Sequence, residues 1–118
     1  MAVTFYWYPN CGTCKKAKKW LDDHSISYEP IHIVENPPTK GEIEELIDKS
    51  GLPAKKFFNT SGMKYRELNM KEKIKDATVS QMAEWLASDG MLIKRPIVTD
   101  GQKVTVGYKE ESFNENWL

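Results

Sequence analysis

Hydrophobic and polar positions in the N-terminal third of the chain follow first a strand pattern, then a helix pattern, then a strand pattern again. Residues 3–8 are β-branched or aromatic, and this run of strand length ends at Pro9. Residues 11–24 have helical periodicity, with Cys14, Ala17 and Leu21 on one face. Residues 28–34 alternate as a second strand, in which Pro30 favours an edge position. This order predicts a parallel βαβ unit with a right-handed crossover.

The middle of the chain is rich in helix signals after a break at Pro37-Pro38. Thr39 and Glu42 have the spacing of a capping box, and the helix that follows is expected to end at Gly51. The residues expected on its buried face are Ile43, Leu46 and Ile47. A second capping box, Thr78 to Gln81, predicts a helix that ends at Gly90 and has an inward face of Val79, Met82, Ala83 and Leu86.

Between the two capping boxes, residues 59–62 have the composition of a turn. The side chains around it that are expected to pack in the core are Phe57, Phe58, Met63, Tyr65 and Leu68.

The C-terminal part returns to a strand pattern. Residues 91–93 lead into the strand 97–99, and 103–106 form the return strand of a hairpin. Asp100-Gly101 favours a two-residue type I′ turn between them, and residues 110–117 are expected to form a closing helix. The whole pattern predicts an α/β fold: βαβ, then a helical insertion at about 37–90, then ββα, in a single domain of residues 1–118.

Composition narrows the classes of partner. The 118 residues include 17 Lys and Arg against 17 Asp and Glu, so the formal net charge is zero. This balance removes the usual electrostatic reason to expect direct binding to nucleic acid or to an anionic membrane. The N-terminus lacks the pattern of a signal peptide, and no segment has the ~20 apolar residues of a membrane helix. A cytoplasmic protein is therefore expected.

The strongest chemical signal is Cys11-Gly12-Thr13-Cys14, at the junction of the first strand and the first helix. Unpaired N–H groups and the helix dipole at that position stabilise a thiolate at Cys11, and Lys15 adds positive charge. Cys14 is placed to attack a mixed disulfide formed at Cys11. We therefore predict Cys11 as the nucleophile and Cys14 as the resolving thiol.

Other interpretations of the cysteine pair stay open at this point. A structural disulfide would close a very short loop and would be reduced in the cytoplasm. A zinc site needs further ligands, but the chain has no other Cys, and His24 and His32 lack zinc-finger spacing, so no metal is expected. Two inert, buried cysteines are the third alternative.

Arg95-Pro96 is the second candidate for a role in the chemistry of the site. Arg95 has the planar fork that binds an anion beside a thiolate, although a solvated surface arginine is the alternative. Pro96 is either a cis turn residue or an edge-strand proline, and spacing alone leaves both open.

Four segments together resemble the ArsC/Spx family of arsenate-reductase-like proteins. They are residues 8–17 (YPNCGTCKKA), residues 65–69 (YRELN), and residues 94–98 (KRPIV) with 106–108 (VGY). In these motifs, the chain is similar to short arsenate-reductase-like proteins of Gram-positive bacteria. The resemblance implies a thioredoxin-like fold with a four-stranded mixed sheet and a helical insertion between its second and third strands. It also implies that Pro96 is cis and faces the thiol of Cys11.

The resemblance distinguishes branches of this family by their arginines. Family members that reduce arsenate hold the oxyanion with three arginines, one of which corresponds to Arg95. The other two would fall near Asn59 and near Val106 or Gly107, where this chain has no Arg. The chain has only two Arg, Arg66 and Arg95, beside 15 Lys. Arsenate reduction is therefore disfavoured.

The functional prediction is a thiol–disulfide oxidoreductase that acts on a small thiol or a protein disulfide. Arg95, Pro96, Gly12, Thr13 and Lys15 are expected to bind or orient the substrate. No tightly bound cofactor is expected, and the expected reductant is glutathione, a glutaredoxin or a thioredoxin. The alternative, from a different class, is a redox-switched regulator similar to Spx that binds the α subunit of RNA polymerase.

Overall fold

The computed structural model describes residues 2–118, and its contacts group the chain into two compact units. One unit consists of the residues up to His32 together with Arg95–Leu118, and the other is Ile33–Lys94. None of the helices in the described part of the chain is long and apolar enough to cross a membrane.

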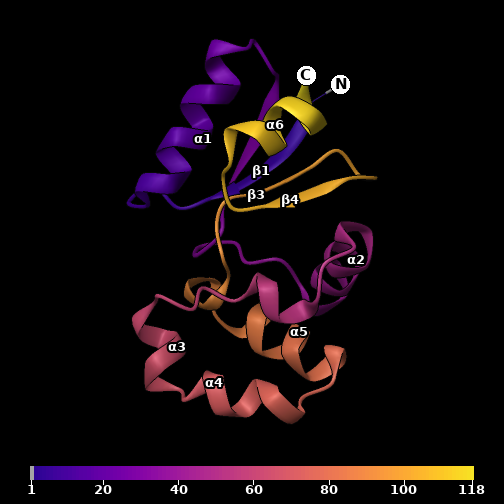
Figure 1. The fold of residues 1–118 in the computed structure, drawn as a ribbon. Coiled ribbons are helices and arrows are strands. Elements are labelled where there is room, and N and C mark those ends of the chain that lie inside the picture. The colour runs from indigo at the N-terminus through magenta and orange to yellow at the C-terminus, as the bar shows by residue number, and fades with distance from the viewer. Residues whose placement is uncertain (1) are drawn as a thin grey trace. The chain divides into compact units, whose positions relative to one another are not determined.

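The first unit contains a four-stranded mixed sheet (Figure 1). Its strands are β1 (Val3–Trp7), β2 (Tyr28–His32), β3 (Ile97–Thr99) and β4 (Val104–Val106), in the order β2-β1-β3-β4. Strand β1 pairs with β2 in parallel and with β3 in antiparallel orientation, and β3 and β4 form an antiparallel hairpin. The predicted mixed sheet is confirmed, and so is the edge position that Pro30 favours in β2.

Two helices bury their apolar sides in the core of this unit. Helix α1 (Gly12–Asp23) buries Cys14, Ala17, Trp20 and Leu21, and α6 (Glu110–Trp117) buries Phe113 and Trp117. The core cluster joins them to the sheet and consists of Val3, Phe5, Ala17, Trp20, Leu21, Val98, Phe113 and Trp117. Because α1 packs on β1 and β3, the sheet determines where the N-terminus of α1 lies.

The turn of the β3–β4 hairpin differs from the predicted type I′ turn. Thr99 pairs with Val104, so residues 100–103 form the loop, and only Gly101 has a positive φ (+95°). A type I′ turn needs positive φ at both central residues. Instead, the carboxylate of Asp100 accepts hydrogen bonds from the backbone N–H groups of Gln102 (2.9 Å) and Lys103 (2.8 Å). These side-chain bonds stabilise the longer loop, and the return strand begins one residue later than predicted.

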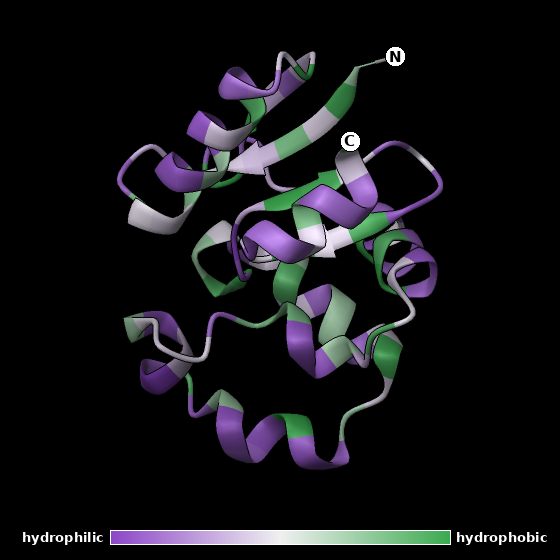
Figure 2. Cartoon of the chain, turned by 45° about the horizontal axis from the view of Figure 1, so that its top comes forward, coloured by the Kyte–Doolittle hydropathy of each residue, from purple (hydrophilic) through white to green (hydrophobic). Residues whose placement is uncertain are grey.

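The second unit is helical. Its elements are α2 (Lys40–Ser50), α3 (Met63–Glu67), α4 (Met70–Lys73) and α5 (Val79–Ser88), with the 3-10 turns η1 (Ala54–Phe57), η2 (Ile74–Asp76) and η3 (Gly90–Leu92). Both predicted capping boxes are present, at Thr39/Glu42 and at Thr78/Gln81. Helices α2 and α5 pack on each other. The reason is that each helix has an apolar buried side, Ile43, Leu46 and Ile47 on α2 and Met82, Ala83 and Leu86 on α5. In Figure 2, hydrophobic and hydrophilic residues accordingly alternate along the helices.

Three residues predicted to lie inward in this unit are exposed instead. Val79 is 48% exposed, Met63 is 73% exposed and Leu68 is 39% exposed. Val79 and Met63 are each the first residue of a helix, where the chain turns towards solvent. Helix α3 is only five residues long and buries only Tyr65, so Met63 and Leu68 fall outside its packed side.

Helix α5 ends before Gly90, the residue at which it was predicted to end, and a 3-10 turn follows it. Helix α5 ends at Ser88 and Gly90 begins η3, so residues 91–93 do not form a strand, although Ile93 makes one bridge with Phe58. Gly90 is buried, and a Cβ atom added there would lie 2.1 Å from the carbonyl oxygen of Ile33. A glycine is therefore required by a close backbone contact rather than as a helix cap.

Candidate functional site

Cys11 lies at the N-cap position of α1. Its backbone is extended (φ −97°, ψ 118°), and its N–H donates to the carbonyl oxygen of Tyr8 (3.0 Å). The Cys11 Sγ accepts a hydrogen bond from the backbone N–H of Cys14 at 3.4 Å. This is the geometry in which the first turn of a helix stabilises a negative charge.

Four contacts lower the pKa of Cys11. Burial acts in the opposite direction and raises it. The side chain and backbone of Cys14 and the hydrogen bond and charge of Arg95 outweigh that burial, so the pKa of the Cys11 thiol lies below its usual range. Cys11 is half-buried, and the next two residues, Gly12 and Thr13, are exposed.

Cys14 has the opposite electrostatics. It is fully buried, and burial together with the neighbouring Cys11 sulfur raises its pKa to about 12. The protonated Cys14 thiol is one of the groups that lower the pKa of Cys11. Both cysteines are free thiols in this structure.

Arg95 reaches the thiol from the segment that leads into β3. Its Cζ atom lies 5.1 Å from the centroid of the Tyr8 ring, a cation–π arrangement that holds the guanidinium near Cys11. The Arg95-Pro96 peptide bond is cis, as the family resemblance implied. Pro96 is buried, and its carbonyl oxygen accepts from the N–H of Gly107 (2.8 Å).

The remaining residues predicted for the site lie on the exposed first turn of α1. Gly12, Thr13 and Lys15 are all exposed, and a Cβ at Gly12 would meet nothing within 4 Å. The side chain of Lys15 makes no hydrogen bond or ion pair with any residue in 2–118, and Arg95 is the cation that lowers the pKa of Cys11. Sequence reasoning missed the contribution of Tyr8, which it placed at the end of the first predicted strand.

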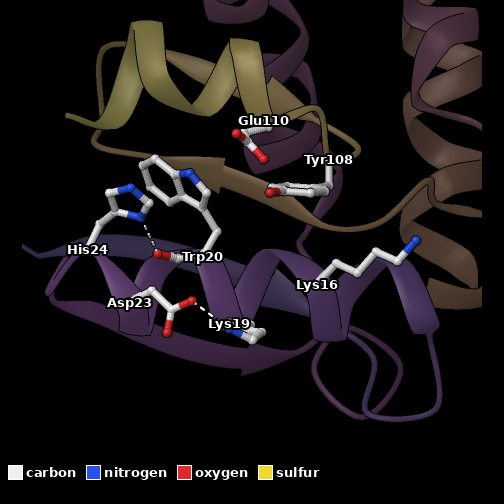
Figure 3. A pocket seen from close by; sticks show the side chains of 7 residues that line it. All are labelled: Lys16, Lys19, Trp20, Asp23, His24, Tyr108 and Glu110. Carbon is white, nitrogen blue, oxygen red and sulfur yellow. Dashed lines mark hydrogen bonds and ion pairs between the residues drawn. The ribbon is translucent and has the colours of Figure 1, made fainter.

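Helix α1 also lines a cavity of about 420 Å³ in its second half (Figure 3). The cavity is lined by Lys16, Lys19, Trp20, Asp23, His24, Tyr108 and Glu110. The His24 ring stacks on Trp20 at 4.2 Å, and its Nδ1–H donates to the Trp20 carbonyl oxygen (2.9 Å). Lys19 and Asp23 form an ion pair (2.7 Å) within the wall. Helix α1 thus begins beside the thiol of Cys11 and, towards its C-terminus, lines a cavity with polar and aromatic walls.

The arrangement at the start of α1 suits nucleophilic sulfur chemistry. An accessible thiol with a lowered pKa, a buried thiol beside it and an arginine are the parts that thiol–disulfide exchange uses. Within residues 2–118, no three His, Cys, Asp or Glu side chains are grouped closely enough to hold a metal ion.

Comparison with known proteins identifies the family of the chain. The ArsC family matches residues 6–116 of the chain. The chain belongs to the ArsC family.

Relatives of this ArsC-family chain include proteins named as regulators. It is 64% identical to the Bacillus subtilis (strain 168) protein YusI over 117 residues, 99% of each chain. It is 29% identical to the global transcriptional regulator Spx of Listeria monocytogenes over 111 residues, which cover 94% of this chain and 83% of Spx. An ArsC family related protein from Bacteroides fragilis has a crystal structure with a TM-score of 0.94 at 44% identity, covering 98% of this chain and 97% of that one. The fold is therefore the thioredoxin-like fold of ArsC proteins.

Replacing Arg95 with glutamine should raise the pKa of Cys11, because the variant loses the cation and donor that stabilise the thiolate. We expect alkylation of Cys11 by iodoacetamide at pH 7 to slow about three- to tenfold, the effect of one partly exposed charge-assisted hydrogen bond. The measurement is the alkylation rate from pH 5 to 10. Arg66→Gln removes the chain's other arginine and serves as the control. An unchanged pH profile in Arg95→Gln would show that Arg95 does not act on the thiol.

Proposed function

We propose that this ArsC-family chain is a thiol–disulfide oxidoreductase in which Cys11 attacks and Cys14 resolves. The observation that carries the proposal is the opposite shift of the two thiols within one helical turn. Cys11 has a lowered pKa and is accessible, whereas Cys14 is buried and has its pKa raised to about 12. A cytoplasmic location, where thiols are kept reduced, fits this chemistry.

In the first step, the Cys11 thiolate attacks one sulfur of a substrate disulfide. A bond forms between Cys11 Sγ and that sulfur, the substrate disulfide breaks, and the other substrate sulfur leaves as a thiolate. In the second step, Cys14 loses its proton and attacks Cys11 Sγ. The second substrate sulfur then leaves, the Cys11–Cys14 disulfide forms, and two electrons have passed to the substrate. An external thiol, which we propose to be glutathione, a glutaredoxin or a thioredoxin, returns the pair to the dithiol.

The contacts of Cys14 support this order of events. Burial is the largest reason for its raised pKa, and the hydrogen bond and charge of Cys11 add to it. When Cys11 forms a mixed disulfide, its sulfur no longer carries the negative charge of the thiolate. The pKa of Cys14 then falls, and its thiol becomes able to attack. The resolving thiol is thus kept protonated until it is needed.

Substrate contacts are proposed for the residues around the exposed side of Cys11. Gly12, Thr13 and Lys15 are exposed on the first turn of α1 and are free to touch a docked chain. We propose the same role for Arg95 and Pro96, which come from a distant part of the sequence. The guanidinium of Arg95, which lowers the pKa of Cys11, would also stabilise a leaving thiolate.

Trapping with Cys14→Ser tests the proposal. The variant should form a mixed disulfide at Cys11 and fail to release it, so that the captured partner can be isolated without reductant and identified by mass spectrometry. The double variant, with Cys11→Ser added, should capture nothing. A Cys14→Ser protein that captures no more than the double variant would contradict the proposal.

A second candidate function is a redox-switched regulator that binds the α subunit of RNA polymerase. The similarity to Spx, which is named as a global transcriptional regulator, favours this candidate. In this role, the Cys11–Cys14 pair would sense oxidation. Binding of the chain to the C-terminal domain of the α subunit should then differ between the reduced and oxidised forms, and no binding in either form would eliminate this function.

Arsenate reduction is the least supported of the functions that the family suggests. Two of the three arginines expected for the oxyanion are replaced, at Asn59 and at Val106 or Gly107. Turnover of arsenate with glutathione and glutaredoxin, compared with the Cys11→Ser variant, tests this directly.

A further inference from the structure

A second, cationic cavity lies in the helical unit 33–94, whereas the cysteines belong to the other unit. It has a volume of about 340 Å³ and is lined by Thr60, Tyr65, Arg66, Asn69 and Lys71. These residues come from the turn before α3, from α3 itself, and from the junction with α4. The cavity therefore lies within one compact unit and is built from a short stretch of chain.

Each residue that lines the cavity offers a hydrogen-bond donor. Arg66 and Lys71 are cationic, and Thr60, Tyr65 and Asn69 contribute hydroxyl and amide groups. No acidic side chain lines it. In a chain whose formal net charge is zero, this is a local concentration of positive charge.

The two cationic side chains that line the cavity make no ion pair or hydrogen bond with a described residue that stabilises the fold. Within residues 2–118, neither Arg66 nor Lys71 makes a side-chain hydrogen bond or an ion pair. The neighbouring lysines do: Lys64 pairs with Glu67 (3.9 Å) and Lys75 with Glu72 (3.2 Å). The nearby carboxylates are thus directed at other cations, and the two cations at the cavity are left available.

Tyr65 gives the cavity a fixed wall. Its side chain is only 8% exposed, and its ring packs edge-on against Phe58 at 6.2 Å. Its hydroxyl makes no hydrogen bond to any described residue. A buried ring holds this donor in place, so part of the site is preorganised.

We propose that this cavity binds the phosphoryl group of a phosphate monoester. A phosphate dianion matches two cations and three neutral donors, and the guanidinium of Arg66 can bind two phosphate oxygens at once. The cavity is larger than a phosphoryl group needs, which leaves room for the organic part of the ligand. This site is independent of the proposed redox function, because its lining residues all belong to the unit 33–94 and include none of the residues assigned to that function.

The test is a titration of the reduced, full-length chain followed by ¹H–¹⁵N NMR, first with inorganic phosphate and then with ribose 5-phosphate. Sodium chloride at matched ionic strength is the reference. Both phosphates should give saturable shifts at the backbone amides of Arg66, Asn69 and Lys71. Tighter binding of ribose 5-phosphate would identify an organic phosphate as the ligand, and equal binding would identify free phosphate.

Arg66→Gln should weaken binding about tenfold, which is the effect of losing a charge-assisted contact to the anion. Lys64→Gln, on the same helix but paired with Glu67, should change binding less than about twofold. Cys11→Ser should bind phosphate like the wild type. The proposal is overturned if the shifts do not saturate, if Arg66→Gln binds as the wild type does, or if a blocked Glu-Glu peptide binds more tightly than both phosphates.

Discussion

Replacing Cys11 with serine should reduce disulfide-exchange activity to the background of the assay, a loss of about a thousandfold or more. The hydroxyl of serine is not ionised at neutral pH, so the contacts that stabilise a thiolate at the start of α1 have nothing to act on. The measurement is the rate at which the reduced protein cleaves a small chromogenic disulfide, with the released thiol recorded spectroscopically.

The matched control for this experiment is Cys14→Ser. It keeps the Cys11 nucleophile and should therefore still release the first thiol in a single turnover, but it should not complete the cycle. It also loses the Cys14 thiol that donates to Cys11, so its first step should be slower than that of the wild type. If Cys11→Ser keeps a rate close to that of Cys14→Ser, Cys11 is not the nucleophile.

Replacing Gly90 with alanine should destabilise the protein by about 3 kcal/mol. A Cβ at this position would lie 2.1 Å from the carbonyl oxygen of Ile33 and 2.9 Å from the Cα of Val34. Both are backbone atoms, so relief requires a shift of the main chain rather than of a flexible side chain. The free energy of unfolding, measured in urea by circular dichroism, checks this expectation.

Gly41→Ala provides the opposite case. Gly41 lies in the first turn of α2, and a Cβ there would meet nothing within 4 Å. Alanine should stabilise the protein by up to about 1 kcal/mol through helix propensity. Equal effects of the two substitutions would show that the contact between Gly90 and Ile33 is not a constraint.

Local patterns predicted much of the fold because their causes are local. Both capping boxes form, since each links residues three positions apart, and residues 110–117 form the predicted closing helix. The prediction of a type I′ hairpin turn was wrong because the carboxylate of Asp100 accepts two backbone hydrogen bonds. These bonds favour a longer loop than the Asp-Gly pair alone suggests. The prediction that Val79 and Met63 are buried was wrong because apolar periodicity does not show where a helix loses its packing partner.

By itself, the sequence determined the order of the elements and placed Cys11 at the start of a helix with Cys14 one turn away. The environment of that pair depends on groups that are distant in sequence. Arg95 lies far along the chain, and only the pairing of β3 with β1 brings it to Cys11 and the ring of Tyr8. The sequence offered both Lys15 and Arg95 as cations at the thiol, and the tertiary structure decided for Arg95, because charge interactions depend on distance in space and not on separation along the chain.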